Sequence, residues 1–374
     1  MKFCVITHVE HVKYNNQYFG YAPYIREMNI WLKYVDKVLI VAPIENKTLN
    51  VIQEPYIHQN LEFIKVSRFD IISIKSILVT LIRLPLIIRN IYQAMNESDH
   101  IHLRCPGNIG LLGCLVQMFF PNKKKTAKYA GNWDPNAKQP LSYKVQKWIL
   151  SNTFLTRNMQ VLVYGEWTNQ TKNIKPFFTA TYSEQEVQKS KVESRKFSSN
   201  TSIRFLFVGA LVKGKQPLYA VKLLKCLKER GIDVYLDLYG EGAERGSLEN
   251  YIKINQLSDI ICINGNQSKE TVLNAYQSAH FLILPSKSEG WPKVVAEAMF
   301  WGCVPVATRV SSVPYMLDFG NRGILLEMEL KSDLDKIAQL IGNTQDYILK
   351  SEKAMEWSRK YTLEYFDTEI KKLI

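Results

Sequence analysis

The sequence predicts an α/β protein built from two doubly wound units, and three observations lead to this prediction. First, 374 residues exceed one ordinary core, because domains average about 150 residues. Second, short apolar runs alternate with helix-length segments, as in parallel strands joined by crossover helices. Third, the alternation stops over residues 184–202, where few large apolar residues occur, and restarts at Ile203.

The expected strands follow one another through both halves. In the first half they are FCVIT, KVLIVAP, LEFIKV, HIHL, TAKYAG and QVLVYG, and in the second IRFLFVG, VYLDLYG, IICING, HFLILPS and VPVAT. Helical patterns include Tyr24 to Tyr34 and Pro217 to Arg230. We expect a first domain over 1–184, a linker over 185–202, a second domain over 203–345 and a helical segment over 346–374 that packs back toward the first domain. Its expected anchors are Ala354, Trp357, Tyr361 and Phe366.

Composition and cysteine use indicate a cytoplasmic globular protein. Hydrophobic residues make up 46% and charged residues 22%, close to the globular average. The six cysteines form no CxxC pair and no metal-ligand spacing, so buried thiols in a reducing compartment are expected. MKFCVITHV enters a strand directly, without the pattern of a secretory signal. The apolar segments Ile71 to Ile91, interrupted by charges and a proline, and Ile109 to Phe120 do not reach the roughly 20 apolar residues of a membrane span.

The net charge of +13 is concentrated in the first half of the chain. Residues 1–184 hold 22 Lys and Arg against 12 Asp and Glu, whereas residues 185–374 hold 26 against 23. Such an excess suits nucleic acid, an anionic membrane surface or an anionic acceptor. No nucleic-acid module or interleaved basic and aromatic pattern is present, so an anionic membrane surface or a lipid-diphosphate acceptor is favoured and nucleic acid is not expected. The inner face of the membrane is then the expected place of peripheral attachment.

Two carboxylates flank one helix start in the segment from Leu284 to Thr308. Glu289 stands in the loop before a helix that opens near Pro292, and Glu297 follows eight residues later, about two helical turns along. The helix N-terminus offers free N–H groups to a diphosphate. Separate carboxylates can accept hydrogen bonds from two diols. Because Glu297 lies among apolar residues, its charge needs a partner.

This segment resembles the donor-binding signature of the retaining GT-B glycosyltransferases of family 4, glycosyl transferases group 1, which includes sucrose synthase and bacterial mannosyltransferases. The match comprises Glu289, Gly290, Trp291, Pro292 and Glu297 with their spacing. The resemblance implies a GT-B fold, two Rossmann-like domains facing across a cleft. It also implies that Glu297 holds the ribose hydroxyls and that Glu289 contacts the donor sugar.

A second match covers FVGALVKGKQPLYAV, where Lys215 falls on the diphosphate lysine of the family. Ala210 departs from the pattern, because the family has an arginine there, and Lys213 is the nearest substitute. YGEG ends a further strand with two glycines, which permit either a close backbone approach to a phosphate or a tight turn. ICINGN ends another strand where the backbone of the family contacts the nucleobase. The full donor set is Gly209, Lys213, Lys215, Gly240, Gly242, Gly265, Asn266, Glu289, Gly290, Trp291, Pro292, Lys293, Val294 and Glu297.

Acceptor and catalytic candidates lie in the first half. Gly20 and Tyr21 occupy the position of a turn that faces the diphosphate and acceptor in the family. His102 and Arg104 end a strand near the reacting sugar, although a strand-end histidine is more often structural. Asn132, Trp133 and Asp134 end the next strand, where they could stack on and hydrogen-bond a saccharide. The expected catalytic residues are Lys215, Glu289, His102 and Arg104.

The sequence thus predicts a retaining, metal-independent hexosyltransferase of the EC 2.4 class. Its donor is a UDP- or GDP-linked sugar and its acceptor a saccharide or lipid-linked saccharide, as in bacterial surface polysaccharide biosynthesis. No metal and no cofactor are expected, because Asp333 and Asp335 begin a late helix, where acids complement the helix dipole. The alternative is a basic nucleotide-binding module without transferase activity, acting at a membrane surface or on nucleic acid.

Overall fold

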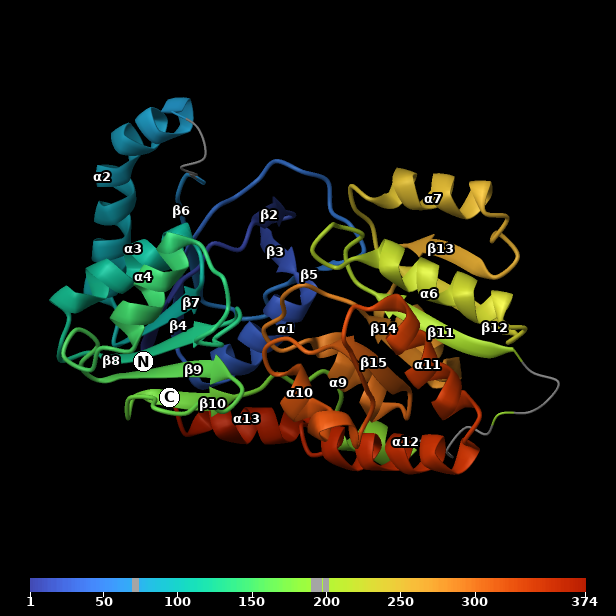
Figure 1. Cartoon of the computed structure of the whole chain (residues 1–374). Coiled ribbons are helices and arrows are strands. Elements are labelled where there is room, and N and C mark those ends of the chain that lie inside the picture. Colours follow the sequence, from blue (N-terminus) through green and yellow to red (C-terminus); the bar gives the residue numbers. More distant parts are fainter. Residues whose placement is uncertain (69–73, 190–196, 198–201) are drawn as a thin grey trace. The chain divides into compact units, whose positions relative to one another are not determined.

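The computed structural model describes residues 1–68, 74–189, 197 and 202–374, and these form two units. The first unit comprises residues 1–179 with 366–374, and the second comprises residues 180–365 (Figure 1). The chain therefore leaves the first unit five residues earlier than the predicted boundary at 184. The predicted linker over 185–202 lies mostly outside the described residues, and its start belongs to a short helix.

The first unit contains a seven-stranded parallel sheet in the order β10-β9-β8-β7-β1-β4-β6 and a small antiparallel sheet in the order β2-β3-β5. The strands are β1 (Lys2–Ile6), β2 (His11–Tyr14), β3 (Gln17–Tyr21), β4 (Lys37–Ala42), β5 (Gln53–Pro55), β6 (Leu61–Lys65), β7 (His100–Cys105), β8 (Lys124–Tyr129), β9 (Met159–Tyr164) and β10 (Ile174–Phe177). The helices are α1 (Ala22–Trp31), η1 (Leu32–Tyr34), α2 (Ile74–Glu97), α3 (Asn108–Val116), η2 (Gln117–Phe119) and α4 (Leu141–Leu150).

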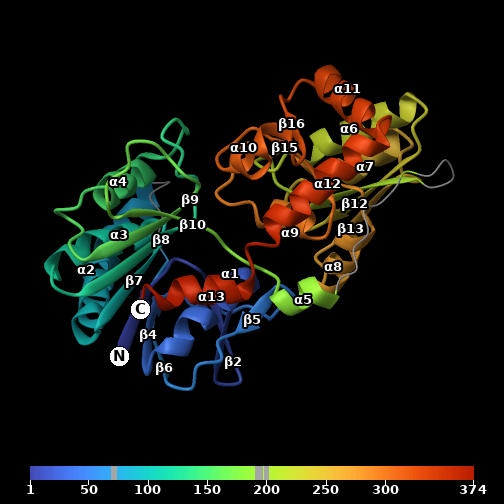
Figure 2. The same cartoon turned by 90° about the horizontal axis from the view of Figure 1, so that it is seen from below.

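Strand order decides which helices share a side of this sheet. The chain runs from β1 to β4 in one direction, and from β6 through β7 and β8 to β9 in the other. Crossovers between parallel strands are right-handed. Helices in connections that move across the sheet in opposite directions therefore cover opposite faces. Helices α2, α3 and α4 therefore lie on one face and α1 on the other, as Figure 2 shows. The direction reverses between β1 and β7, which is where open α/β sheets bind ligands.

The second unit contains a six-stranded parallel sheet in the order β13-β12-β11-β14-β15-β16. The strands are β11 (Ile203–Val208), β12 (Val234–Tyr239), β13 (Ile261–Gly265), β14 (Phe281–Leu284), β15 (Val304–Thr308) and β16 (Ile324–Leu326). The helices are α5 (Glu184–Lys189), α6 (Pro217–Glu229), α7 (Arg245–Ile254), α8 (Lys269–Ser278), α9 (Lys293–Phe300), α10 (Val313–Met316), η3 (Asp318–Gly320), α11 (Leu330–Ile341) and α12 (Thr344–Ser358). Here the direction reverses between β11 and β14.

Apolar runs form the central strands of both units, because parallel strands are covered on both faces. The two cores include Cys4, Ile6, Leu39 and Ile101 in the first unit, and Phe205, Leu236 and Ile283 in the second. All eleven predicted strands are present, which confirms the predicted α/β class. The strands missed were the shortest ones and those of the antiparallel sheet.

Gly20 corrects one prediction, because it lies in a strand and not in a loop. Asn15 and Asn16 turn with positive φ angles of 46° and 60°, and two such residues in succession are typical of the type I′ hairpin turn. The hairpin pairs Gly20 with His11. A Cβ at Gly20 would lie 2.9 Å from Ile25 Cδ1, so this glycine serves packing.

The C-terminal helical prediction divides between the units. Ser351 donates a hydrogen bond to the Gly302 carbonyl over 2.7 Å, so α12 belongs to the second unit, beyond the predicted boundary at 345. Helix α13 (Leu363–Lys371) crosses the division. The Phe366 ring lies 5.6 Å from Phe177 and 5.8 Å from Phe178, which joins residues 366–374 to the first unit.

No helix among residues 1–68, 74–189 and 202–374 combines the length and apolar character that a bilayer span needs. The six cysteines are free thiols, four of them buried and two half-buried.

Three buried histidines predict acid sensitivity of the first unit. Burial lowers the pKa of His11 from 6.5 to about 4 and the pKa values of His100 and His102 from 6.5 to about 3. Below pH 6.5 the unfolded chain binds protons that the folded unit excludes, so stability present at neutral pH is lost as the pH falls toward 4. Each histidine contributes up to about 1.4 kcal/mol per pH unit. Amide hydrogen exchange in β1 and β7, measured from pH 7.5 to 5 and corrected for intrinsic rates, should report a falling unfolding free energy. Protection independent of pH would contradict this prediction.

Candidate active site

The second unit brings two predicted site residues to the point where its sheet reverses direction. Lys215 follows β11 and Glu289 follows β14, and these strands are neighbours. Lys215 Nζ lies 2.5 Å from Glu289 Oε1, with the two side chains 29% and 9% exposed. Ligands of open α/β sheets bind outside the carboxyl ends of strands at this place. The two residues that the sequence singled out thus form one partly buried ion pair.

The loops that carry Lys215 and Glu289 are tied together beside the ion pair. Lys287 donates its N–H to the Gly214 carbonyl over 2.8 Å, and Gln216 Nε2 donates to the Pro285 carbonyl over 2.6 Å. On the far side of Glu289, the Gly290 carbonyl accepts a hydrogen bond from Ser312 Oγ over 2.7 Å. These bonds fix the position of the ion pair, and apart from Gly290 they come from residues that the sequence motif did not single out.

Helix α9 starts directly after this loop, with Pro292 as the residue before its first turn. The first N–H groups of a helix have no partner within the helix, and together with the helix dipole they favour an anion. Lys293 and Val294 supply the first two of these positions. The helix start, the Lys215 ammonium and the loop glycine Gly290 therefore offer the elements that a diphosphate needs.

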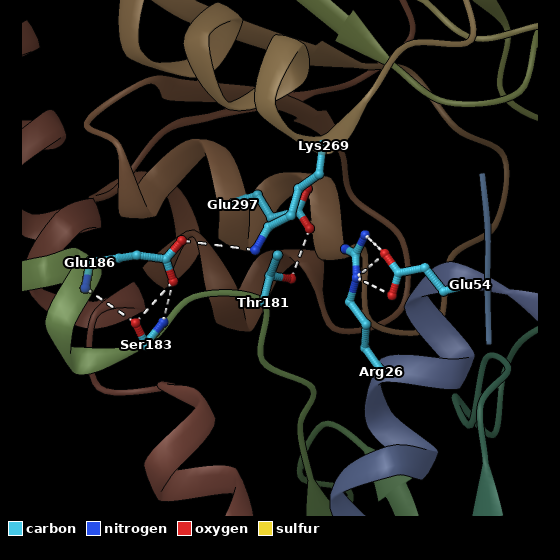
Figure 3. A network of polar contacts seen from close by, with 7 residues as sticks. All are labelled: Arg26, Glu54, Thr181, Ser183, Glu186, Lys269 and Glu297. Atoms are coloured by element: carbon cyan, nitrogen blue, oxygen red, sulfur yellow. Dashed lines mark hydrogen bonds and ion pairs between the residues drawn. The ribbon is translucent and has the colours of Figure 1, made fainter. Parts of the chain in front are cut away.

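Glu297 lies about one turn into α9, and its carboxylate accepts hydrogen bonds from two hydroxyl groups. Thr181 Oγ1 donates to Glu297 Oε1 over 2.8 Å (Figure 3). The Tyr276 hydroxyl donates to Glu297 Oε2 over 3.0 Å. Burial, followed by the Glu297 charge, raises the pKa of Tyr276 well above its usual value, so the phenol remains a donor. The expectation that this carboxylate needs a partner is confirmed. Neither partner was predicted, because no local pattern marks them.

The predicted donor glycines at the strand ends allow neighbouring backbone segments to pack closely. A Cβ at Gly240, which has a φ of +143°, would overlap the Gly209 carbonyl, and a Cβ at Gly242 would overlap the Leu211 carbonyl. Gly209 in turn donates its N–H to the Tyr239 carbonyl over 2.9 Å. Gly265, with a φ of +67°, approaches Glu241. These contacts support the simpler of the two interpretations, a tight packing of loops at the sheet edge.

Replacing Gly240 with alanine should therefore destabilise the second unit. The new Cβ requires both a strained φ and a displaced carbonyl, a cost of roughly 2–4 kcal/mol. Gly246→Ala is the matched control, because Gly246 lies in α7 with no atom within 4 Å of its Cβ position. Urea unfolding followed by circular dichroism measures both. A Gly240→Ala protein as stable as Gly246→Ala would contradict the role given to this glycine.

Other donor predictions need correction or stay open. The Trp291 side chain is 7% exposed and its ring stacks on Trp357 at 5.8 Å, so it anchors the loop to α12 and does not face a ligand. Lys213 and Asn266 have exposed side chains. Ala210, also exposed, places no second cation at the family arginine position.

The Asp-x-Asp pattern in α11 has a structural explanation. Asp333 is fully buried and accepts hydrogen bonds from the Glu327 and Met328 N–H groups, at 2.8 and 3.0 Å, and from the Tyr219 hydroxyl at 2.6 Å. Asp335 pairs with Arg230 at 2.7 Å. Across residues 1–68, 74–189 and 202–374, no group of three or more His, Cys, Asp or Glu side chains is arranged to hold a metal ion.

The first unit has a cavity of about 540 Å³ at its own point of reversal. It opens beyond the ends of β1, β4 and β7, and its lining includes His8, Tyr21, Arg68 and Asn108. Of the predicted acceptor residues only Tyr21 lines it. His8 was not predicted, although its place directly after the first strand could have indicated it.

His8 lines the cavity and keeps an exposed surface. Desolvation by the surrounding atoms, followed by the charge of Arg104, lowers its pKa from 6.5 to about 4. The imidazole is neutral at pH 7 and can accept or donate a hydrogen bond. A Cβ at Gly107 would lie 2.6 Å from His8 Nδ1, so the glycine makes room for this ring.

The other residues predicted to bind the acceptor or to act in catalysis make contacts within the protein. The side chain of Trp133 is 2% exposed, and its indole N–H donates to Gln170 over 2.9 Å. Asn132 and Asp134 each accept a backbone N–H two residues ahead, so they shape the loop.

His102 and Arg104 lie two residues apart in β7, and their side chains make different contacts. His102 is 1% exposed, packs on Trp31 at 4.6 Å and bonds to Thr126 over 2.9 Å. The catalytic prediction for His102 is therefore not supported, because its ring belongs to the core. Arg104 lies 3.5 Å from buried Glu27, which also pairs with Lys128 at 2.7 Å.

Two parallel-sheet units of this topology, with an ion pair and a helix start at the reversal of the second sheet, define the GT-B fold class. Solved structures agree. Sucrose-phosphate synthase from Thermosynechococcus elongatus matches with a TM-score of 0.70 and 16% identity over 100% of this chain and 98% of that one. Anabaena HepE, in complex with UDP-glucose, matches with a TM-score of 0.70 and 14% identity over the same shares.

The sequence of the second unit is similar to a known family. Residues 189–360, somewhat less than half of the chain, match the family described as glycosyl transferases group 1. An uncharacterised glycosyltransferase of Methanocaldococcus jannaschii is 32% identical over 42% of this chain and 44% of the relative. A D-inositol 3-phosphate glycosyltransferase of Paenarthrobacter aurescens is 28% identical over 38% of this chain and 36% of the relative. The matches thus span less than half the length of these curated relatives.

Proposed function

We propose that this protein transfers a sugar from a nucleotide diphosphate donor to a saccharide or lipid-linked saccharide, with retention of anomeric configuration and without a metal ion. The observation that carries the proposal is the Lys215–Glu289 ion pair beside the start of α9, with Glu297 further along the same helix. UDP is the favoured nucleotide, because the structurally similar HepE was solved with UDP-glucose. Retention rests on the family resemblance of the motif.

The chemistry of transfer assigns a task to each group. Departure of the diphosphate develops negative charge on its β-phosphate, which the Lys215 ammonium and the N–H groups of α9 stabilise. When a phosphate binds Lys215, Glu289 becomes free to accept a hydrogen bond from a donor-sugar hydroxyl. Glu297 accepts hydrogen bonds from the ribose. Metal independence rests on this ammonium, which supplies the positive charge at the leaving group.

The acceptor is assigned to the cavity of the first unit. His8, Arg68 and Asn108 line it with a neutral imidazole, a cation and an amide. Arg68 is ion-paired with Glu10, which also lines the cavity, so the lining offers hydrogen-bond donors and acceptors to saccharide hydroxyls. We place the reaction in bacterial surface polysaccharide synthesis at the cytoplasmic side of the membrane, since the basic excess of the first half favours an anionic acceptor or surface.

Turnover of UDP-linked and GDP-linked sugars tests the proposal. Melting temperatures in a panel of nucleotides and nucleotide sugars should first identify the donor. NMR of the product should then show the anomeric configuration of the donor, and turnover should persist in EDTA. An inverted product, or activity restored only by Mg²⁺ or Mn²⁺, would overturn the mechanism. Nucleotide binding without turnover on any saccharide or lipid-linked acceptor would favour the alternative of a binding module.

A further inference from the structure

Helices α2 and α4 and the segments after α3 and α4 expose large apolar side chains on one side of the first unit. Ile82 and Leu86 lie in α2, Leu141 and Trp148 in α4, Phe119 in η2 and Phe154 after α4, and these six are between 61% and 81% exposed. Helix α3 contacts both α2 and α4, and the three helices cover the same face of the sheet. Single exposed apolar residues need no explanation, but a concentration of them indicates an interaction surface.

In α2 the apolar residues stand opposite the core. Ile87, Ile91 and Ala94 are buried and follow the helical period. Ile82, Leu86 and Arg89 occupy positions i, i+4 and i+7 on the opposite stripe, where a helix at a protein surface normally carries polar residues. Helix α2 is therefore a crossover helix whose inner side is buried and whose outward side is exposed. Residues 71–73 of the predicted segment lie outside the described residues.

In α4 the same arrangement recurs. Gln146, Ile149 and Leu150 are buried, whereas Leu141, Lys144, Val145 and Trp148 form the outward stripe. Phe154 follows α4, and the Arg157 guanidinium lies 4.6 Å from the centre of its ring. Exposed tryptophan and phenylalanine beside basic side chains are typical of the interface between lipid headgroups and acyl chains.

The charges on this side have one sign. Arg83, Arg89, Lys144 and Arg157 are exposed, and none of them is ion-paired with a carboxylate in the described part of the chain. The one carboxylate within α2, α3 and α4 is Glu97, at the last position of α2, and it lies 3.8 Å from Lys2. A second copy of the chain docked symmetrically on this side would bring the four cations against one another. An anionic surface would compensate them.

We propose that the side of the first unit formed by α2, α3 and α4 docks on an anionic lipid bilayer. Ile82, Leu86 and Trp148 enter the boundary between headgroups and acyl chains, and the four basic side chains lie over anionic headgroups. The exposed Ile and Leu side chains between the aromatic ones cannot stack on bases but are stabilised by burial among acyl chains, so a bilayer fits the surface better than nucleic acid. The inference adds a partner to the proposed function and rests on it only for the lipid-linked nature of the acceptor.

Co-sedimentation of the full chain with vesicles tests the proposal. Vesicles of phosphatidylglycerol and phosphatidylcholine should bind the protein at low salt, and vesicles of phosphatidylcholine alone should bind it at least about tenfold more weakly. The double variant Leu86→Gln/Trp148→Gln should reduce binding to the anionic vesicles by about tenfold or more. Its matched control, Ile254→Gln/Phe319→Gln, removes two residues of the second unit that are 70% and 73% exposed. The control should bind like the unaltered protein.

Charge variants measure the electrostatic contribution to vesicle binding. Arg83→Gln/Arg89→Gln should weaken binding and flatten its salt dependence, whereas Lys222→Gln/Lys253→Gln in the second unit should change neither. No binding at low salt, or equal binding of the apolar double variant, would overturn the proposal. A dimer in solution that the apolar double variant dissociates would overturn it in favour of self-association. UDP affinity, measured on every variant, shows that the donor site is intact. If the protein binds vesicles but transfers no sugar, the proposed function is refuted and the docking proposal is retained.

Discussion

Replacing Lys215 with alanine should lower the turnover of sugar transfer by about a hundred- to a thousandfold, the usual effect of removing one positioned group that stabilises transition-state charge. The ammonium is held 2.5 Å from Glu289, and the two loops are hydrogen-bonded to each other, so the charge is already in place before a donor binds. Steady-state kinetics at saturating donor measure the effect. The loss should fall mainly on kcat, because charge on the β-phosphate increases in the transition state.

Two neighbouring lysines make this prediction specific. Lys222 lies exposed on α6, within the same unit, so Lys222→Ala should retain normal turnover. Lys213 is exposed in the loop after β11, and a loss of turnover in Lys213→Ala would assign it the role of the arginine that Ala210 replaces. Normal turnover in a folded Lys215→Ala protein would refute the assignment of the diphosphate site.

The long parallel strands could be predicted from the sequence for a physical reason. A strand covered on both faces must be apolar at almost every position, and segments such as KVLIVA and FLIL carry that pattern locally. The hairpin at Asn15 and Asn16 was missed, although two asparagines in succession are a known hairpin signal. The division of α12 and α13 between the units depends on contacts distant in sequence, so no local pattern reveals it.

The proximity of Lys215 and Glu289 was predictable because they follow strands that are adjacent in the sheet. That these residues and Glu297 bind a donor stays a prediction. The acceptor side was not predictable, because strand-end position alone does not say which way a side chain points. His102 and Trp133 both point into the core, whereas His8 and Arg68 line the cavity from loops without a motif. Successive side chains of a strand point to opposite faces. A position wrong by one residue therefore assigns a core side chain to the cavity.

Replacing Glu297 with alanine should weaken nucleotide binding by about a hundredfold. In the structure both carboxylate oxygens already accept a hydroxyl, from Thr181 at 2.8 Å and from Tyr276 at 3.0 Å. These bonds hold the carboxylate in one orientation while leaving each oxygen a further lone pair for ribose. Two hydrogen bonds to a charged group, each worth about 1.5–3 kcal/mol, account for a loss of this size. Calorimetric titration with UDP and GDP measures it.

Three further variants test whether the carboxylate acts on the nucleotide or only on its protein partners. Tyr276→Phe and Thr181→Val each remove one donor to Glu297 and should weaken binding by no more than about tenfold, since one neutral partner of the carboxylate is lost. Glu297→Gln keeps the side-chain volume and one acceptor, so its affinity should lie between that of the unaltered protein and that of Glu297→Ala. The alanine variant also leaves the buried Tyr276 hydroxyl without its acceptor, and urea unfolding separates this cost from binding. An unchanged nucleotide affinity in a folded Glu297→Ala protein would remove Glu297 from the ribose site and leave it a purely structural partner of Tyr276.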